Sequence, residues 1–282
     1  MHLSTVATVL EYEVKAPTHF CFNIEAAHWP TQKILSERLA VSSGVAPHSF
    51  TDDVSGNRFF RFDASPGPLL VDYKADVEVY SEQVDEHLPQ TPVGEVPDAI
   101  FKYLMATRYC ESDLLGSVAQ QLFGNEEPGI ARVRKVAKWI HDSIEYRPGS
   151  TNSTTTAQEV LVQRAGVCRD FAHLGIALCR ALNVPARLVV GYVWFDEPPQ
   201  DFHAVFEAWF GGRWVLFDPT GMAPVDRLVR IGTGRDAKDV AFSTFFGEVE
   251  MTRMELSVLE HEPRRTPDSG EAVVELAAAG SA

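Results

Sequence analysis

The spacing of apolar residues changes abruptly at Pro97, and this change limits the folds that the chain can adopt. Residues 1–96 contain short β-prone stretches, such as residues 3–14 and 69–80, with turn residues between them. Beyond Pro97 the apolar residues recur with helical spacing, and strand patterns return near Arg187. Helices that precede a sheet indicate an α+β fold. We therefore expect an all-β domain followed by helices packed on an antiparallel sheet.

This pattern divides the chain into four segments. Residues 1–96 are expected to form a β-sandwich-like domain, and residues 97–225 the α+β core. Residues 226–259 are expected to extend the core, because the alternating stretch 250–259 could add an edge strand. Residues 260–282 are rich in charged and small residues, which predicts a disordered tail.

Helix-start signals predict four helices in the core. They are a helix capped by Asp98 that carries Ile100, Phe101, Leu104, Met105, Leu114 and Leu115; a helix after Pro128-Gly129 that ends before Arg147; a short helix with a Thr156/Glu159 capping box; and a helix from Cys168 to Asn183. Strands are expected at residues 187–195, 203–210 and 213–218.

Composition excludes several classes of function. The formal charge of −14 argues against nucleic acid or an anionic membrane as a partner, because both attract clusters of Lys and Arg. No apolar run approaches the roughly 20 residues that span a bilayer, and the first residues do not resemble a signal peptide, so we expect a cytoplasmic location. The four cysteines are scattered and form no CxxC pair, which favours free thiols.

Cys168 is the cysteine best placed for chemistry. It opens an expected helix, and the unpaired N–H groups at a helix N-terminus favour the thiolate, which is the reactive form. Gly166 would let the backbone turn sharply just before it. Cys21, Cys110 and Cys179 are not at expected helix starts, so we interpret them as inert.

A tight turn at Gly211-Gly212 predicts the partner of that thiol. Two glycines between β-prone runs are typical of a two-residue hairpin. If Phe210 pairs with Arg213, then His203 and Asp218 are diagonal neighbours on one face of the sheet, close enough for a hydrogen bond. Asp218 would then fix the tautomer of His203 and stabilise its charged form. A register slip of one residue would place them on opposite faces.

Other interpretations of the same residues were weighed. Asp218 could simply belong to an Asp-Pro-Thr-Gly turn. His173 lies on the Cys168 helix but points away from the thiol. Asp170 could position the loop, although its charge opposes thiolate formation. The chain has no HExxH motif, no zinc-type Cys/His spacing and no GxSxG elbow, so we expect neither a metal nor a cofactor.

The order of these residues resembles the transglutaminase-like superfamily. Three segments carry the resemblance: RAGVCRDFAHLGIALCRALNVPARLVVGYV, DFHAVFEAWF and GRWVLFDPTG. Together with WIHDSIEYRPGSTNSTTTAQEVL they span residues 96–225, and the β region and VRIGTGRDAKDVAFSTFFGEVE resemble bacterial members with an N-terminal β domain. The resemblance implies a papain-like α+β core, with Cys168 as nucleophile, His203 as base and Asp218 as the orienting residue.

The resemblance does not fix the reaction, because the superfamily includes cross-linkers, peptidases and deglycosylases. We expect a cysteine peptidase or amidase that forms a thioester with a peptide or protein substrate. The alternatives are a protein-glutamine acyltransferase and a non-catalytic peptide-binding member. The oxyanion would be held by the Cys168 N–H and a second donor among Tyr146, Gln158 and Gln163. Candidate pocket walls are Trp194, Phe202, Trp209 and Trp214.

Overall fold

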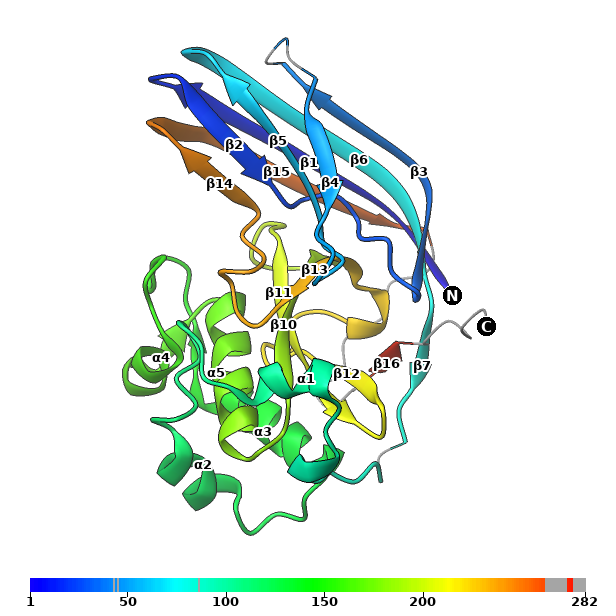
Figure 1. The fold of residues 1–282 in the computed structure, drawn as a ribbon, viewed down its shortest axis with the longest axis vertical. Coiled ribbons are helices and arrows are strands. Elements are labelled where there is room, and N and C mark those ends of the chain that lie inside the picture. The colour runs from blue at the N-terminus through cyan, green and yellow to red at the C-terminus, as the bar shows by residue number, and fades with distance from the viewer. Residues whose placement is uncertain (43, 45, 86, 262–272, 276–282) are drawn as a thin grey trace.

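A computed structural model describes residues 1–42, 44, 46–85, 87–261 and 273–275. The chain forms a β-sandwich stacked on a second part in which helices pack against a sheet (Figure 1). This arrangement confirms the expected α+β fold, with an antiparallel sheet in the core and a β-rich part before it.

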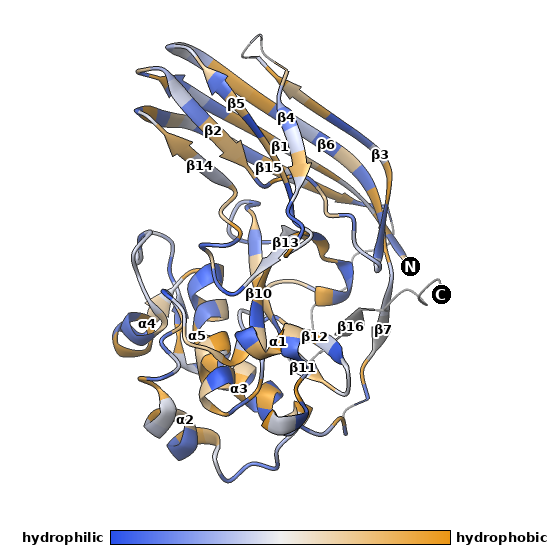
Figure 2. Cartoon of the chain, viewed as in Figure 1, coloured by the Kyte–Doolittle hydropathy of each residue, from blue (hydrophilic) through white to orange (hydrophobic). Residues whose placement is uncertain are grey.

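The sandwich consists of two four-stranded sheets, in the orders β15-β1-β6-β3 and β14-β2-β5-β4. Residues of β1 alternate between buried and half-buried, because one face of the strand lies on the sandwich core. Figure 2 shows the same alternation along the long strands. The strands of the N-terminal region are β1 His2–Val14, β2 Thr18–Phe22, β3 Gln32–Val41, β4 His48–Thr51, β5 Arg58–Ala64 and β6 Gly67–Val79.

The last strands of the sandwich come from the C-terminal region. β14 (Ser243–Phe246) pairs with β2, and β15 (Val249–Glu260) pairs with β1 along its whole length. The alternating stretch therefore forms an edge strand as expected, but on the sandwich and not on the core. The reason is its apolar face, because Met254, Leu256 and Val258 pack against the sandwich core.

The core is built around α5 (Cys168–Ala181), which lies on a six-stranded sheet of order β13-β10-β11-β12-β16-β7. α5 is buried from Asp170 to Arg180, as a helix covered on several sides must be. The other core strands are β7 Ser81–Gln83, β10 Ala186–Tyr192, β11 His203–Phe210, β12 Arg213–Phe217, β13 Val229–Gly234 and β16 Val273–Glu275, and β8 Glu145–Tyr146 pairs with β9 Ala165–Gly166. The rest of the expected C-terminal tail lies outside the described residues.

The expected helix from Asp98 to Leu115 is wrong. Only two short turns form there, α1 (Asp98–Phe101) and the 3-10 turn η2 (Lys102–Leu104), and Pro97 occupies the N-cap position. Most of the apolar stripe does not face the core, since Phe101, Met105 and Leu114 are exposed and only Leu115, at its end, is fully buried. The helices α3 Ile130–Ser143 and α4 Ala157–Gln163 agree with expectation, with the Thr156/Glu159 capping box in place. The helix α2 Gly116–Phe123 was not predicted, and the 3-10 turns η1 Val93–Glu95 and η3 Val225–Arg227 lie in loops.

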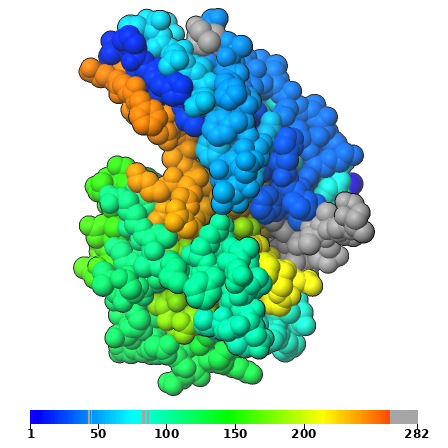
Figure 3. Space-filling view, in the orientation of Figure 1, coloured from blue at the N-terminus to red at the C-terminus, as the bar shows by residue number. Residues whose placement is uncertain are grey.

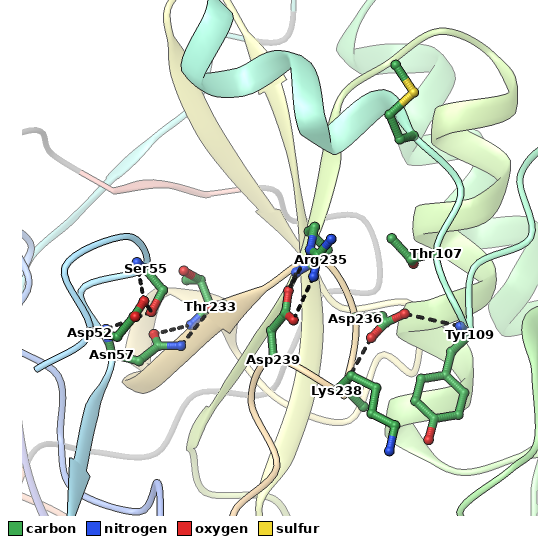
Figure 4. A network of polar contacts seen from close by, with 12 residues as sticks. Asp52, Ser55, Asn57, Thr107, Tyr109, Thr233, Arg235, Asp236, Lys238 and Asp239 are labelled. Carbon is green, nitrogen blue, oxygen red and sulfur yellow. Dashed lines mark hydrogen bonds and ion pairs between the residues drawn. The ribbon is translucent and has the colours of Figure 1, made fainter.

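Buried polar contacts join the two parts of the molecule. The Asn57 side chain donates to the Thr233 carbonyl and accepts from the Thr233 N–H, both at 2.9 Å (Figure 4). Beside it, Arg235 pairs with Asp239 at 2.9 Å. In space-filling view a hollow separates β14, in orange, from the green helical part (Figure 3). No helix in the described part of the chain is long and apolar enough to cross a membrane.

Candidate active site

Cys168 is the first residue of α5 and is partly exposed. The turn before it is held by the buried Asp170 carboxylate, which accepts hydrogen bonds from the Val167 N–H at 2.9 Å and the Thr151 hydroxyl at 2.6 Å. Arg169 pairs with the same carboxylate at 3.0 Å. The charge of Asp170 is therefore largely compensated, and its role is to shape the helix start that presents the thiol.

His203 and Asp218 form a buried hydrogen-bonded pair. Nε2 of His203 lies 2.9 Å from Oδ2 of Asp218, and both side chains are almost fully buried. The hairpin has the register predicted from Gly211-Gly212, with Phe210 opposite Arg213. Asp218 is also held by the N–H of Thr220 at 2.9 Å and the Thr220 hydroxyl at 2.7 Å. The contacts with Thr220 thus hold the Asp218 carboxylate in place independently of its contact with the imidazole.

The pair is charged. Burial acts to lower the pKa of His203, but the Asp218 carboxylate outweighs it and raises that pKa to about 10. The pKa of Asp218 is lowered despite burial, because His203 and Thr220 stabilise its ionised form. An imidazolium–carboxylate pair is therefore the favoured state near neutral pH.

The Cys168 thiol lies beside this pair. Charge and hydrogen bonding from its side chain contribute to the raised pKa of His203, and Nδ1 of His203 makes no well-aligned hydrogen bond with any other described side chain. The nearest recorded contact of Sγ is the Phe202 carbonyl oxygen, at 3.8 Å. Nδ1 is thus the imidazole atom left free to exchange a proton with the thiol.

Tyr146 is the oxyanion candidate that lies at the thiol. Burial raises the pKa of Tyr146 well above its ordinary value, and the Cys168 charge and hydrogen bonds to Cys168 also act on it. A phenol with a raised pKa stays protonated and can donate a hydrogen bond. Gln163 instead donates to the Ala165 carbonyl, and Gln158 and Gln163 line a separate cavity of about 490 Å³.

Several sequence candidates lie elsewhere. His173 is buried, stacks on Tyr109 and accepts a hydrogen bond from the Ala237 N–H, and burial lowers its pKa to about 4. Of the expected pocket walls, Phe202 has its carbonyl oxygen 3.8 Å from the thiol, but its ring packs against Tyr192 and Phe242 in an apolar cluster. Trp209 and Trp214 pack against each other. Burial raises the thiol pKa of the two interior cysteines, Cys110 and Cys179, to about 12, so both are inert.

Asp201 is a site residue that the sequence reasoning missed. Its carboxylate interacts electrostatically with both His203 and Tyr146. The signal available was its position, two residues before His203, at the end of a loop with further acidic residues. Within the described residues, no three side chains of His, Cys, Asp and Glu come together as metal ligands would.

Comparisons with known proteins identify the family of this chain. Residues 116–219 match a model of the transglutaminase-like superfamily, and residues 2–98 match the bacterial transglutaminase N-terminal domain. A solved structure described as a candidate cysteine protease from Cytophaga hutchinsonii is 38% identical, with a TM-score of 0.91 and 97% of each chain covered.

Two curated mycobacterial relatives are uncharacterized proteins. The one from Mycobacterium leprae is 33% identical over 158 residues, or 52% of this chain and 55% of its own. The one from Mycobacterium tuberculosis is 37% identical over 143 residues, or 46% of each chain. The chain spans about half the length of these relatives. Taken together, the two family models and the solved structure show that the chain belongs to the transglutaminase-like superfamily, in its bacterial form with an N-terminal β domain.

Proposed function

We propose that this protein is a cysteine-dependent amide or peptide hydrolase that acts through a thioester on Cys168. The observation that carries the proposal is the buried His203–Asp218 pair, 2.9 Å apart, beside a partly exposed thiol at a helix N-terminus. A peptide or protein is the proposed substrate, since an open thiol at a domain junction admits a long chain.

The first half of the reaction forms the thioester. In the thiolate–imidazolium state, Nδ1 of His203 already carries the proton of Cys168, and the thiolate attacks the carbonyl carbon of an amide. The tetrahedral oxyanion accepts hydrogen bonds from the Cys168 N–H and the Tyr146 hydroxyl. When the C–N bond breaks, His203 returns the proton to the leaving amine, while Asp218 holds the ring and stabilises its positive charge.

The second half releases the acyl group. Neutral His203 takes a proton from water, the resulting hydroxide attacks the thioester, and the Cys168 thiolate leaves as the carboxylic acid is released, which restores the thiolate–imidazolium pair. An amine in place of water would give transfer and a new amide. Hydrolysis is the simpler proposal because it needs no binding site for a second substrate.

The thiol chemistry is tested by alkylation. Iodoacetamide at neutral pH should label Cys168 stoichiometrically in the wild type and much more slowly in His203→Ala. Cys21, the other cysteine that is not fully buried, is the internal control, since burial raises its pKa. Equal labelling of Cys168 and Cys21 would contradict the proposal and favour a non-catalytic peptide-binding protein.

Whether water or an amine accepts the acyl group is tested separately. The protein is incubated with casein and a labelled primary amine, with Cys168→Ala as the control. Peptide cleavage without amine incorporation would support hydrolysis, whereas incorporation that depends on Cys168 would show the alternative, a protein-glutamine acyltransferase.

A further inference from the structure

Asp201 differs from the other charged residues around the thiol. Asp170 is neutralised by Arg169 at 3.0 Å, and Asp218 by His203 at 2.9 Å. No Lys or Arg in the described part of the chain forms an ion pair with Asp201. The residue keeps part of its surface in contact with solvent, while burial raises the pKa of its carboxyl group. When ionised, Asp201 therefore faces the His203 imidazolium, which already pairs with Asp218, and has no Lys or Arg partner among the described residues.

The position of Asp201 is set by the residue that touches the thiol. Oδ1 of Asp201 accepts a hydrogen bond from the Phe202 N–H at 2.6 Å, and the Phe202 carbonyl oxygen lies 3.8 Å from Sγ of Cys168. The carboxylate also interacts with Tyr146, the proposed oxyanion donor. Asp201 is therefore held next to the place where the attacked carbonyl must lie.

The negative charge of Asp201 disfavours the Cys168 thiolate, and the local structure does not require that charge. A carboxylate near a cysteine opposes formation of the thiolate. The hydrogen bond to Phe202 needs only an acceptor, which Asn or Ser would also provide. Moreover, the loop from Val193 to Phe202 contains Asp196 and Glu197 besides Asp201, but no Lys or Arg. The surroundings therefore suit a cation that arrives with the substrate.

We propose that Asp201 is a specificity-determining residue that binds a primary ammonium group of the substrate beside the amide attacked by Cys168. This inference rests on the proposed function. One oxygen of Asp201 is occupied by Phe202, so the carboxylate offers a single free acceptor, which suits an ammonium better than the two-pronged guanidinium. The ammonium belongs either to a free α-amino group or to a lysine-type side chain.

Charged thiol reagents test this without a known substrate. The rates at which Cys168 reacts with 2-aminoethyl, methyl and 2-sulfonatoethyl methanethiosulfonate are compared at pH 7.5. The wild type should prefer the cationic over the anionic reagent, and Asp201→Asn should reduce that ratio about tenfold, as the loss of one nearby charge predicts. Asp201→Glu should retain most of the preference.

Glu197→Gln is the matched control, because it removes an equal, exposed charge from the same loop. It should change the ratio less than about twofold, because exposed charges farther from the thiol are screened. Equal effects of the two variants, or none in Asp201→Asn, would overturn the ammonium site. The proposed function fails by a different result, namely a Cys168 thiol that is unreactive toward the neutral reagent as well.

The length of the reagent distinguishes the two sources of the ammonium. Aminoethyl and aminopentyl methanethiosulfonates are each compared with an uncharged alkyl reagent of the same length. An Asp201-dependent preference that is larger for the short reagent would indicate an α-ammonium next to the attacked carbonyl. A larger preference for the long reagent would indicate a lysine-type side chain, and no preference at either length would contradict the proposal.

Discussion

The charge state of His203 depends chiefly on Asp218. Burial alone would leave the imidazole neutral, and Asp218 reverses this and raises the pKa of His203 to about 10. A histidine whose pKa is raised by folding stabilises the protein at any pH below its unfolded pKa, about 6.5, and this stabilisation is lost as pH rises through its folded pKa. Asp218 adds its own contribution above the ordinary pKa of Asp, because its pKa is lowered. The pair therefore stabilises the fold most between about pH 5 and pH 6.5.

Asp218→Asn should remove this stabilisation. We expect the free energy of unfolding to fall by about 3 kcal/mol at pH 6 relative to the wild type, and the difference to shrink toward pH 10.5, where His203 is neutral in both proteins. Urea denaturation at the two pH values measures it. The exposed pair His19–Asp63, at 2.8 Å, provides the control, since Asp63→Asn should change stability little at either pH. A difference that does not depend on pH would contradict this account.

Tyr146→Phe should separate acylation from thiol reactivity. Attack on an amide creates an oxyanion, whereas alkylation by iodoacetamide does not. We expect the acylation rate to fall about 100-fold with KM little changed, as for other single oxyanion donors. The rate of alkylation of Cys168 should stay within about twofold of the wild type. Parallel losses in both measurements would mean that Tyr146 acts on the thiol and not on the oxyanion.

Part of the site could be predicted from the sequence because its geometry is local. The Gly211-Gly212 turn sets the register of β11 and β12, and this register brings His203 and Asp218 together. Asp201 and Tyr146 could not be assigned in the same way. Their proximity to the thiol depends on a loop and on the β8–β9 pair, whose conformations no short-range pattern specifies.

At the scale of elements, α5 and β11 carry the nucleophile and the base, so their separation determines whether the two side chains meet. Gly175 of α5 lies directly against Phe206 of β11, and a Cβ added at Gly175 would lie 2.6 Å from that ring. The absence of a side chain here allows the helix to approach the strand closely.

Gly175→Ala should therefore push α5 away from β11. We expect a loss of about 1–3 kcal/mol in the free energy of unfolding from overpacking, together with slower alkylation of Cys168. Adding Phe206→Leu to this variant should restore part of the stability and part of the alkylation rate. Gly116→Ala, at a helix position with open space around it, is the control and should be nearly neutral. Normal thiol reactivity in a destabilised Gly175→Ala protein would show that this contact serves stability alone.

The helices that could be predicted from the sequence are those with strong local signals. α3, α4 and α5 have caps or breakers next to a regular apolar stripe. The stripe from Ile100 to Leu115 has the same spacing, but several of its residues face solvent and no helix forms across it. For β15 the pattern gave the strand but not its partner, because pairing with β1 joins opposite ends of the chain.

At the scale of the molecule, the chain leaves the sandwich after β6, forms the core, and returns to the sandwich as β14 and β15. The junction contains side chains from both parts, and Tyr192, Phe202 and Ile231 of the core belong to the same apolar cluster as the sandwich interior. Since Phe202 also contacts the Cys168 thiol, the site lies where the two parts meet. Phe202 thus links the candidate site to the apolar interior of the sandwich.

This arrangement predicts that the two parts unfold together and that Asn57 couples them. Asn57→Ala should leave the buried N–H and carbonyl of Thr233 without partners. We expect the free energy of unfolding to fall by about 2–3 kcal/mol. Hydrogen exchange of amides in β1 and in α5, followed against urea, should show one shared midpoint in the wild type and two separate midpoints in the variant. Asn125→Ala, an exposed change in the core, should keep them together. Separate midpoints already in the wild type would mean that the sandwich and the core are independent units, and that the sandwich can unfold without loss of the His203–Asp218 pair.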